Sequence, residues 1–178
     1  ITTDAIREVL RVVVPEAVLP ELHGSTFDVV GERGPMEFAA FDRQCSAVAR
    51  ATGAVASRLA TEDRSMILEG VHLAPGAMTR QLSGHPADPI VVERLVMIDE
   101  SRHTEHLRAR TESEPLRGGH RYLDRFRELR SIQTHLIEQA HAEGIRIVGS
   151  HEATELTQDI VDEIAVRATA ATRSAVGA

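Results

Sequence analysis

Acidic, basic and histidine side chains follow the short apolar segments of this chain. In chain order, these side chains are Asp4 and Arg7 after Thr3, then Glu69 and His72, then Asp99, Glu100, Arg102 and His103, and finally Ser150 and His151 after Gly149. Such groups can hold phosphate, bind a divalent cation or move a proton. Ligands of open α/β sheets bind beyond the carboxyl ends of the strands, so we expect these side chains to converge on one edge.

At two of these places, around Glu69 and around Asp4, each side chain has both a structural and a functional interpretation. The predicted strand ends in Ile67 and Leu68 and is followed by Glu69 and Gly70. A carboxylate at a strand end can hold the Mg²⁺ of a nucleotide directly or through water. Glu69 can equally cap the turn that follows. Asp4 either caps the first helix, as Thr3 also could, or orients a substrate hydroxyl. Arg7 is either solvated or grips a substrate phosphate or carboxylate.

Arginines crowd the stretch 102–130 on both sides of Gly118 and Gly119. They are Arg102, Arg108, Arg110, Arg117, Arg121, Arg125, Arg127 and Arg130. A mobile Arg-rich segment that closes over phosphates is typical of a kinase lid, because a transferring phosphoryl group needs positive charge around it. The alternative is a solvated helix face on which these arginines, Arg127 in particular, pair with nearby acids.

Other reactive residue types point to no site. His103 and His106 could share a helix face, but no further His or Cys has suitable spacing nearby, so zinc is not favoured. Cys45 lies in the apolar pattern of a predicted helix, and we expect it to be a core residue rather than a nucleophile. The sequence has no G-x-S-x-G motif of the serine hydrolases.

Composition limits the class of protein. With 178 residues, 42% of them hydrophobic, the chain can form one domain with a real core, residues 1–178. The net charge of −7 gives no global attraction to nucleic acid or to an anionic membrane, and no segment is long enough to span a bilayer. The single cysteine fits a reducing compartment, and we expect a cytoplasmic protein. All 20 basic residues are arginines, which excludes a Schiff-base lysine and a phosphate-loop lysine.

Periodicity predicts alternating strands and helices. We expect helices at 4–13, 35–62, 101–112, about 122–143 and 154–170, strands at 66–68, 94–98 and 145–148, and loops at 20–34 and 74–89. In the second helix, Phe41, Cys45, Val48 and Thr52 form one buried face, and Gly144 ends the fourth. The strand at 66–68 suits burial on both faces. The order of elements predicts an α/β fold, a parallel sheet with helices on both faces.

Several motifs, in this order, resemble the 2-phosphoglycerate kinase family, a branch of the P-loop kinases. The resembling stretches are TTDAIREVLR (2–11), LPELHGSTF (19–27), FDRQCSAVA (41–49), MILEGVHLAPG (66–76), RYLDRFRELRSIQTHL (121–136) and GIRIV (144–148). They cover nearly the whole chain, and EGVHLAPG together with the RYL…F…IR-like helix is specific as a set.

The resemblance implies transfer of the γ-phosphate of ATP, with Mg²⁺, to a small phosphorylated acid, 2-phosphoglycerate. It implies that Asp4 and Glu69 are catalytic, and that Glu69 also serves the metal indirectly. The implied substrate-binding residues are Arg7, Arg11, His72, Arg102, Arg108 and Arg110, the last three in a lid region of about 101–120. The alternative function is a non-catalytic relative that binds anions or phospho-ligands or has a regulatory role.

One departure from the family pattern is large. The strand and G-x-x-x-x-G-K-[ST] loop that precede the T-D-x-x-R segment in such kinases do not occur in this sequence. In this fold the missing strand is central, so 66–68 and 95–98 would flank a gap with apolar edges. We therefore expect an N-terminally incomplete domain whose open edge is covered by another segment, by self-association or by a partner chain. The alternative is a collapsed sheet in which those two strands pair directly.

Overall fold

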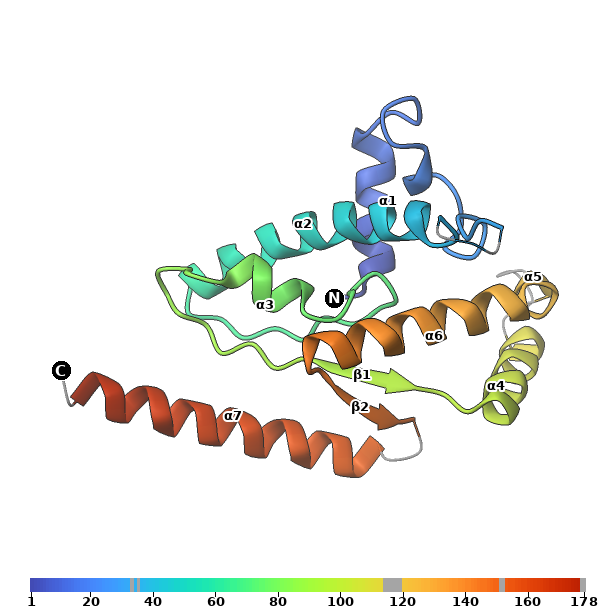
Figure 1. Ribbon diagram of the computed structural model, residues 1–178. Helices are drawn as coiled ribbons and strands as arrows, with labels where there is room; N and C mark the ends of the chain where they lie inside the picture. The colour runs from blue at the N-terminus through green and yellow to red at the C-terminus, as the bar shows by residue number, and fades with distance from the viewer. Residues whose placement is uncertain (33, 35, 114–119, 151–152, 177–178) are drawn as a thin grey trace.

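The computed structural model describes residues 1–32, 34, 36–113, 120–150 and 153–176, and Figure 1 shows the course of the chain. The helices are α1 (Thr3–Val13), the short 3-10 helix η1 (Pro20–Leu22), α2 (Ala39–Thr61), α3 (Ala77–Leu82), α4 (Glu100–Ser113), α5 (His120–Asp124), α6 (Phe126–Glu143) and α7 (Ala153–Val176), and the strands are β1 (Arg94–Met97) and β2 (Arg146–Gly149). In the part of the chain that the structure describes, no helix is both long and apolar enough to cross a membrane.

A small parallel sheet confirms the expected α/β class. In β1 and β2, Arg94 lies opposite Arg146 and Met97 lies opposite Gly149. Helix α6 packs on one side of this sheet, and α7 lies on the other side (Figure 1). Parallel strands need a long crossover between them, and here α4, α5 and α6 supply it.

A second parallel pairing joins the start of the chain to the segment before Gly70. The amide of Thr3 donates to the carbonyl of Glu69 (2.8 Å), and the amide of Glu69 donates to the carbonyl of Ile1 (3.1 Å). The backbone nitrogen of Ile1 adds a bond to the carbonyl of Ile67 (2.8 Å). These bonds form one isolated bridge, between Thr2 and Glu69, rather than a strand ladder.

The prediction of a strand buried on both faces at 66–68 is wrong. Ile67 is 84% exposed, and Met66 and Leu68 are only half-buried. The reason is that, within the part of the chain that the structure describes, this segment pairs along one edge alone, with residues 1–3. Among the described residues, no ladder joins it to β1, so the collapsed pairing is not observed.

The apolar face of α2 is confirmed, and it organises the core. Phe41 and Cys45 pack with Ile132 and Leu136 of α6. One turn further along, Val48 packs with Leu22 of η1, and half-buried side chains of α1 complete that cluster. Helix α2 therefore connects α1 to α6, two elements that carry different predicted site residues.

Two predicted elements differ from the structure: the helix at about 122–143 and the loop at 74–89. The predicted helix at about 122–143 is divided at Arg125 into α5 and α6, although Gly144 ends α6 with φ +66° as expected. The predicted loop at 74–89 contains α3, because Glu93 accepts hydrogen bonds from the amides of Gly76 and Thr79 at its start (both 2.7 Å). A cap so distant in sequence leaves no local signal.

Helices α1 and α7 also differ from the predictions. The N-cap of α1 is Thr2, whose hydroxyl accepts from the amide of Ala5, and neither Thr3 nor Asp4 serves as the cap. Helix α7 continues to Val176 rather than ending near residue 170. Ile164 of this helix is 43% exposed, and ion pairs from Arg94 to Asp159 and Glu163 join the helix to β1.

Arg94 is the centre of those ion pairs. Its side chain is 8% exposed and donates to Asp159 (2.8 Å) and to Glu163. We expect Arg94→Ala to lower the free energy of unfolding by about 2–3 kcal/mol, since two carboxylates lose their shared partner. Urea titration measures the loss, and hydrogen exchange across 155–173 locates it.

The matched control is Arg167→Ala, which removes an exposed partner of the same Glu163 carboxylate. It should cost less than about 1 kcal/mol, because exposed pairs contribute little. Equal losses for the two variants would contradict the role assigned to Arg94.

Candidate functional site

The candidate site lies where α1 begins beside the segment that ends at Gly70. The bond from the Thr3 amide to the Glu69 carbonyl brings Asp4 and Glu69 to the same edge. The Oδ1 atom of Asp4 lies 3.9 Å from Nε of Arg7 and 3.9 Å from Nδ1 of His72. The structure thus brings Asp4 and Arg7 together with Glu69 and His72, two pairs that lie far apart in sequence.

The two carboxylates at this edge face solvent. The Asp4 side chain is 74% exposed, and Glu69 is exposed as well. A solvated carboxylate at this place can accept a proton from a bound hydroxyl or contribute an oxygen to a metal ion. Arg11, one turn beyond Arg7, forms an ion pair with Glu8 at 2.9 Å, which orients its guanidinium along α1.

His72 is fully buried behind these carboxylates. Its Nδ1 atom lies 3.0 Å from the hydroxyl of Thr3, and its Nε2 atom lies 3.2 Å from the hydroxyl of Thr26 and 3.2 Å from Oε1 of Gln44. Burial lowers the pKa of His72 to about 4; Asp4 opposes this shift, and Arg7 adds to it. The imidazole is therefore neutral at pH 7.

Arg7 is directed toward the loop that follows η1. Its side chain is 13% exposed, and Nη1 donates to the carbonyl of Gly24 (2.6 Å) and to that of Leu22 (3.5 Å). Within the described part of the chain, its buried Nε has no hydrogen-bond partner. Arg7 therefore secures the loop, and its buried Nε lies 3.9 Å from Asp4.

Gly70 lets α1 approach this closely. A Cβ atom at Gly70 would lie 1.9 Å from the hydroxyl oxygen of Thr3, and the φ angle of this glycine is +136°. Both the space and the backbone conformation exclude a side chain. The position of Thr3 thus explains the first glycine of the EGVHLAPG motif, Gly70.

The arginines of the predicted lid form a separate group. Arg102 and Arg108 are exposed on α4, and Arg110 lies on the same helix, with its side chain outside the described structure. Arg117 lies outside the described residues altogether. In Figure 1, α4 lies beside α5 at the start of α6, away from α1. No described contact joins Arg102 or Arg108 to Asp4, Arg7, Glu69 or His72.

Ile98 and His103 join the start of α4 to α6. The carbonyl of Ile98 accepts from Arg130 (2.7 Å) and Gln133 (3.1 Å), and its amide donates to Gln133 (3.1 Å). His103 packs against Phe126 at 5.4 Å, and its pKa is lowered first by burial and then by Arg130 and His106. These contacts join the start of α4 to α6.

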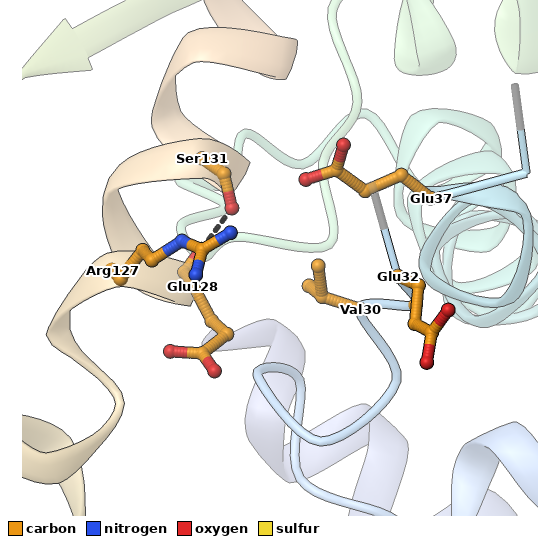
Figure 2. A pocket seen from close by; sticks show the side chains of 7 residues that line it. Val30, Glu32, Glu37, Arg127, Glu128 and Ser131 are labelled. Carbon is orange, nitrogen blue, oxygen red and sulfur yellow. Dashed lines mark hydrogen bonds between the residues drawn. The ribbon is translucent and has the colours of Figure 1, made fainter. Parts of the chain in front are cut away.

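A cavity of about 550 Å³ lies elsewhere, between α6 and the segment before α2. In Figure 2, the guanidinium of Arg127 is directed toward this space, and the carboxylate of Glu37 is directed toward it from the other side. It is lined by Val30, Gly31, Glu32, Glu37, Arg127, Glu128 and Ser131. None of the predicted site residues lines it, and its three carboxylates do not favour a phosphate ligand.

The donor set limits the metal chemistry. Among the described residues, no group of three or more His, Cys, Asp or Glu side chains could hold a metal ion. Mg²⁺ in kinases takes one or two carboxylates and completes its shell with phosphates and water, so the exposed Glu69 fits such an ion. Cys45 is a core residue as predicted: it is buried, and burial raises the pKa of its thiol.

The sequence did not predict the three partners of the His72 ring, which are Thr3, Thr26 and Gln44. One signal was available for Gln44. It lies three residues after Phe41 and four before Val48, so a polar side chain occupies the buried face of α2. Thr26 lies in a loop, where no periodicity marks a buried position.

The fold and the candidate site are those of an α/β protein with carboxylates and arginines at strand ends, as in kinases. Curated relatives point to a particular family. A protein from Methanopyrus kandleri is 30% identical over 92% of this chain and 51% of its own length, and one from Pyrococcus furiosus is 31% identical over 92% and 54%. One from Methanocaldococcus jannaschii is 28% identical over 94% and 54%.

Each of these relatives is named 2-phosphoglycerate kinase. The resemblance to the 2-phosphoglycerate kinase family is thus confirmed over nearly the whole chain. The chain spans about half the length of the curated relatives it matches. No family model matches the chain, and no solved structure matches it significantly.

The fit of Thr3 against Gly70 gives a stability prediction. We expect Gly70→Ala to lower the free energy of unfolding by about 3 kcal/mol, because the new methyl group overlaps the Thr3 hydroxyl at a positive φ. The control is Gly84→Ala, at φ +71° in open space, which should cost about 1 kcal/mol. Chemical denaturation of both variants measures the difference, and similar losses would remove the steric argument.

His72 gives a pH prediction. Its pKa is about 4 in the folded protein against the ordinary 6.5, so between these values the unfolded chain takes up a proton that the folded chain does not. The free energy of unfolding should therefore fall by up to roughly 3 kcal/mol as the pH decreases through this window, and this contribution is constant above it.

The measurement is the pH dependence of urea unfolding in the wild type and in His72→Asn. The variant should show a shallower slope between pH 4 and 6.5, whatever its absolute stability. The control His141→Gln changes an exposed histidine and should keep the wild-type slope. A wild-type slope in His72→Asn would contradict the assignment.

Proposed function

We propose that this chain forms the acceptor-binding part and the lid of an ATP-dependent kinase that phosphorylates 2-phosphoglycerate. One observation carries the proposal: the pairing of Thr3 with Glu69, which brings Asp4, Arg7 and Glu69 to one edge. Support comes from the relatives, all named for this reaction in the matches above. The substrate class follows from their names and from the arginines of the site.

Asp4 is proposed as the group that accepts the proton of the attacking hydroxyl. Its carboxylate is exposed, and its histidine neighbour is neutral at pH 7, so no cation of His72 neutralises it. Arg7 is proposed to hold a substrate carboxylate or phosphate with the donors that the Gly24 carbonyl does not use. Arg11 lies next along the same helix.

Glu69 is the proposed residue for Mg²⁺, indirectly or through one oxygen. When bound, the ion and ATP would supply the activated phosphoryl group. The phosphate loop that holds ATP in such kinases has no counterpart in this sequence, so no residue of this chain is assigned to the nucleotide phosphates. Arg102, Arg108 and Arg110 are proposed to approach the phosphate of the acceptor substrate as a lid carried by α4.

The open edges of the two pairings suggest where a phosphate-loop strand would add. Ile67 is 84% exposed beside one pairing, and Val96 of β1 is 49% exposed in the other. Apolar strand residues with open edges are suited to accept another strand. We propose that such a strand, carrying the phosphate loop, comes from another segment or from a partner chain.

A second candidate function is non-catalytic binding of an anionic ligand. The observation in its favour is the exposure of Arg102 and Arg108 on α4, because exposed guanidinium groups can bind an anion without a nucleotide. In this case Arg7 and the arginines of α4 would bind a phospho-ligand without transfer.

Phosphoryl transfer tests the first function. The chain is assayed with labelled ATP, Mg²⁺ and 2-phosphoglycerate, alone and joined to the portion of the Methanopyrus kandleri relative that lies outside the match. We expect transfer by the joined protein, with rates about 100-fold lower in Asp4→Asn and in Glu69→Gln, because each removes a carboxylate at the reacting groups. The control Glu16→Gln changes an exposed carboxylate beyond α1 and should keep the rate.

Other outcomes separate the candidates. Binding of 2-phosphoglycerate that depends on Arg7, without transfer in the joined protein, would favour the non-catalytic function. Transfer that is unaffected in Asp4→Asn and in Glu69→Gln would contradict the proposed site.

A further inference from the structure

We propose that Gln44 is a positioning residue: it holds His72 as the tautomer with the proton on Nε2, and His72 in turn holds Thr3 and the start of α1 beside Glu69. His72 then supports the candidate site from behind and does not contact substrate. The link to Asp4 rests on the proposed function, whereas the tautomer itself does not.

The first step is the orientation of the Gln44 amide. Its Nε2 atom lies 2.5 Å from the carbonyl oxygen of Glu21 and 3.3 Å from that of Gly24. Backbone carbonyls only accept hydrogen bonds, so the atom that faces them must be the NH₂ group. The carbonyl end, Oε1, is therefore the end that faces His72. Since Gln44 is fully buried, no water competes for these positions.

The second step is the proton of His72. Oε1 of Gln44 lies 3.2 Å from Nε2, and an amide oxygen can only accept. A lone pair on Nε2 would face this oxygen without a proton between them, which is costly in a buried place. The proton therefore lies on Nε2, where the hydroxyl of Thr26 at 3.2 Å is a further acceptor.

The third step is the hydroxyl of Thr3. With Nε2 protonated in the neutral ring, Nδ1 is an acceptor, so the Thr3 hydroxyl at 3.0 Å donates to it. The same hydroxyl oxygen occupies the space left by the missing Cβ of Gly70. Thr3 is 1% exposed and precedes Asp4, so this bond sets the position at which α1 presents the Asp4 carboxylate.

The charged groups near the ring are Asp4 and Arg7, both on α1. Asp4 favours a second proton on the ring, whereas Arg7 and burial oppose it. With Nδ1 unprotonated, the 3.9 Å approach of Asp4 is not an ion pair, so the neutral ring does not compete with a ligand for this carboxylate. A protonated ring would instead attract the Asp4 carboxylate, and its Nδ1 atom could no longer accept a hydrogen bond from the Thr3 hydroxyl.

Nuclear magnetic resonance of the ring nitrogens tests the tautomer without any need for activity. The chain, with its nine histidines labelled with ¹⁵N, is measured at pH 7, and His72→Asn assigns the His72 signals. We expect the pattern of a neutral ring with the proton on Nε2, unchanged down to about pH 5. A proton on Nδ1, or a charged ring at pH 7, would overturn the proposal, even if no further variant folds.

Gln44→Met keeps the size of the side chain and removes the acceptor. We expect the preference for Nε2–H to fall and a fraction of Nδ1–H to appear. The control Gln139→Met removes an amide that contacts His135 instead, and it should leave the His72 signals unchanged. Wild-type signals in Gln44→Met would overturn the role of Gln44.

The joined protein described above tests the link to Asp4. We expect Gln44→Met to lower kcat for 2-phosphoglycerate by about 10-fold with a smaller change in KM, because a displaced carboxylate affects the reacting geometry more than binding. An unchanged kcat in an active protein would overturn this link. If the joined protein transfers no phosphate while the tautomer is found as expected, the proposed function fails and the role of Gln44 in holding His72 is supported.

Discussion

The close approach of Thr3 to Gly70 is the constraint on which the candidate site depends. Two backbone bonds join residues 1–3 to Glu69, and the Thr3 side chain fits only because position 70 has no Cβ. Behind it, His72 connects Thr3 to Gln44 on α2 and to Thr26 in the loop after η1. One buried ring therefore aligns three segments that are distant in sequence. A polar group so deeply buried contributes to a unique arrangement only when all its partners are present, as they are here.

Charge is divided between two regions that α2 and α6 hold apart. Exposed carboxylates lie at the start of α1, whereas Arg102 and Arg108 lie on α4, whose root is secured to α6 through Ile98. Phe27, next to Thr26, packs edge-on against Tyr122 of α5 at 5.5 Å, and this contact joins the loop of the His72 network to the base of the Arg-bearing region.

The curated relatives support one family. Sequence identity of 24–31% extends over more than nine-tenths of the chain, which spans about half the length of these relatives. Two apolar side chains beside the parallel pairings are exposed: Ile67, next to the bridge between Thr2 and Glu69, and Val96 of β1.

Sequence alone determined the features that depend on local periodicity and on motif order. The helices α1, α2, α4, α6 and α7, the parallel strands β1 and β2, the buried face of α2, the end of α6 at Gly144 and the family resemblance all follow from such patterns. Tertiary structure alone decided the exposure of Ile67, the formation of α3 on the distant cap Glu93, and the burial of His72 with Thr26 and Gln44. These features depend on contacts between residues 14 to 69 positions apart, and neither helical nor strand periodicity carries information over such separations. His72 shows the difference most clearly: its position in the motif marked it as part of the site, but only its partners reveal that it faces inward.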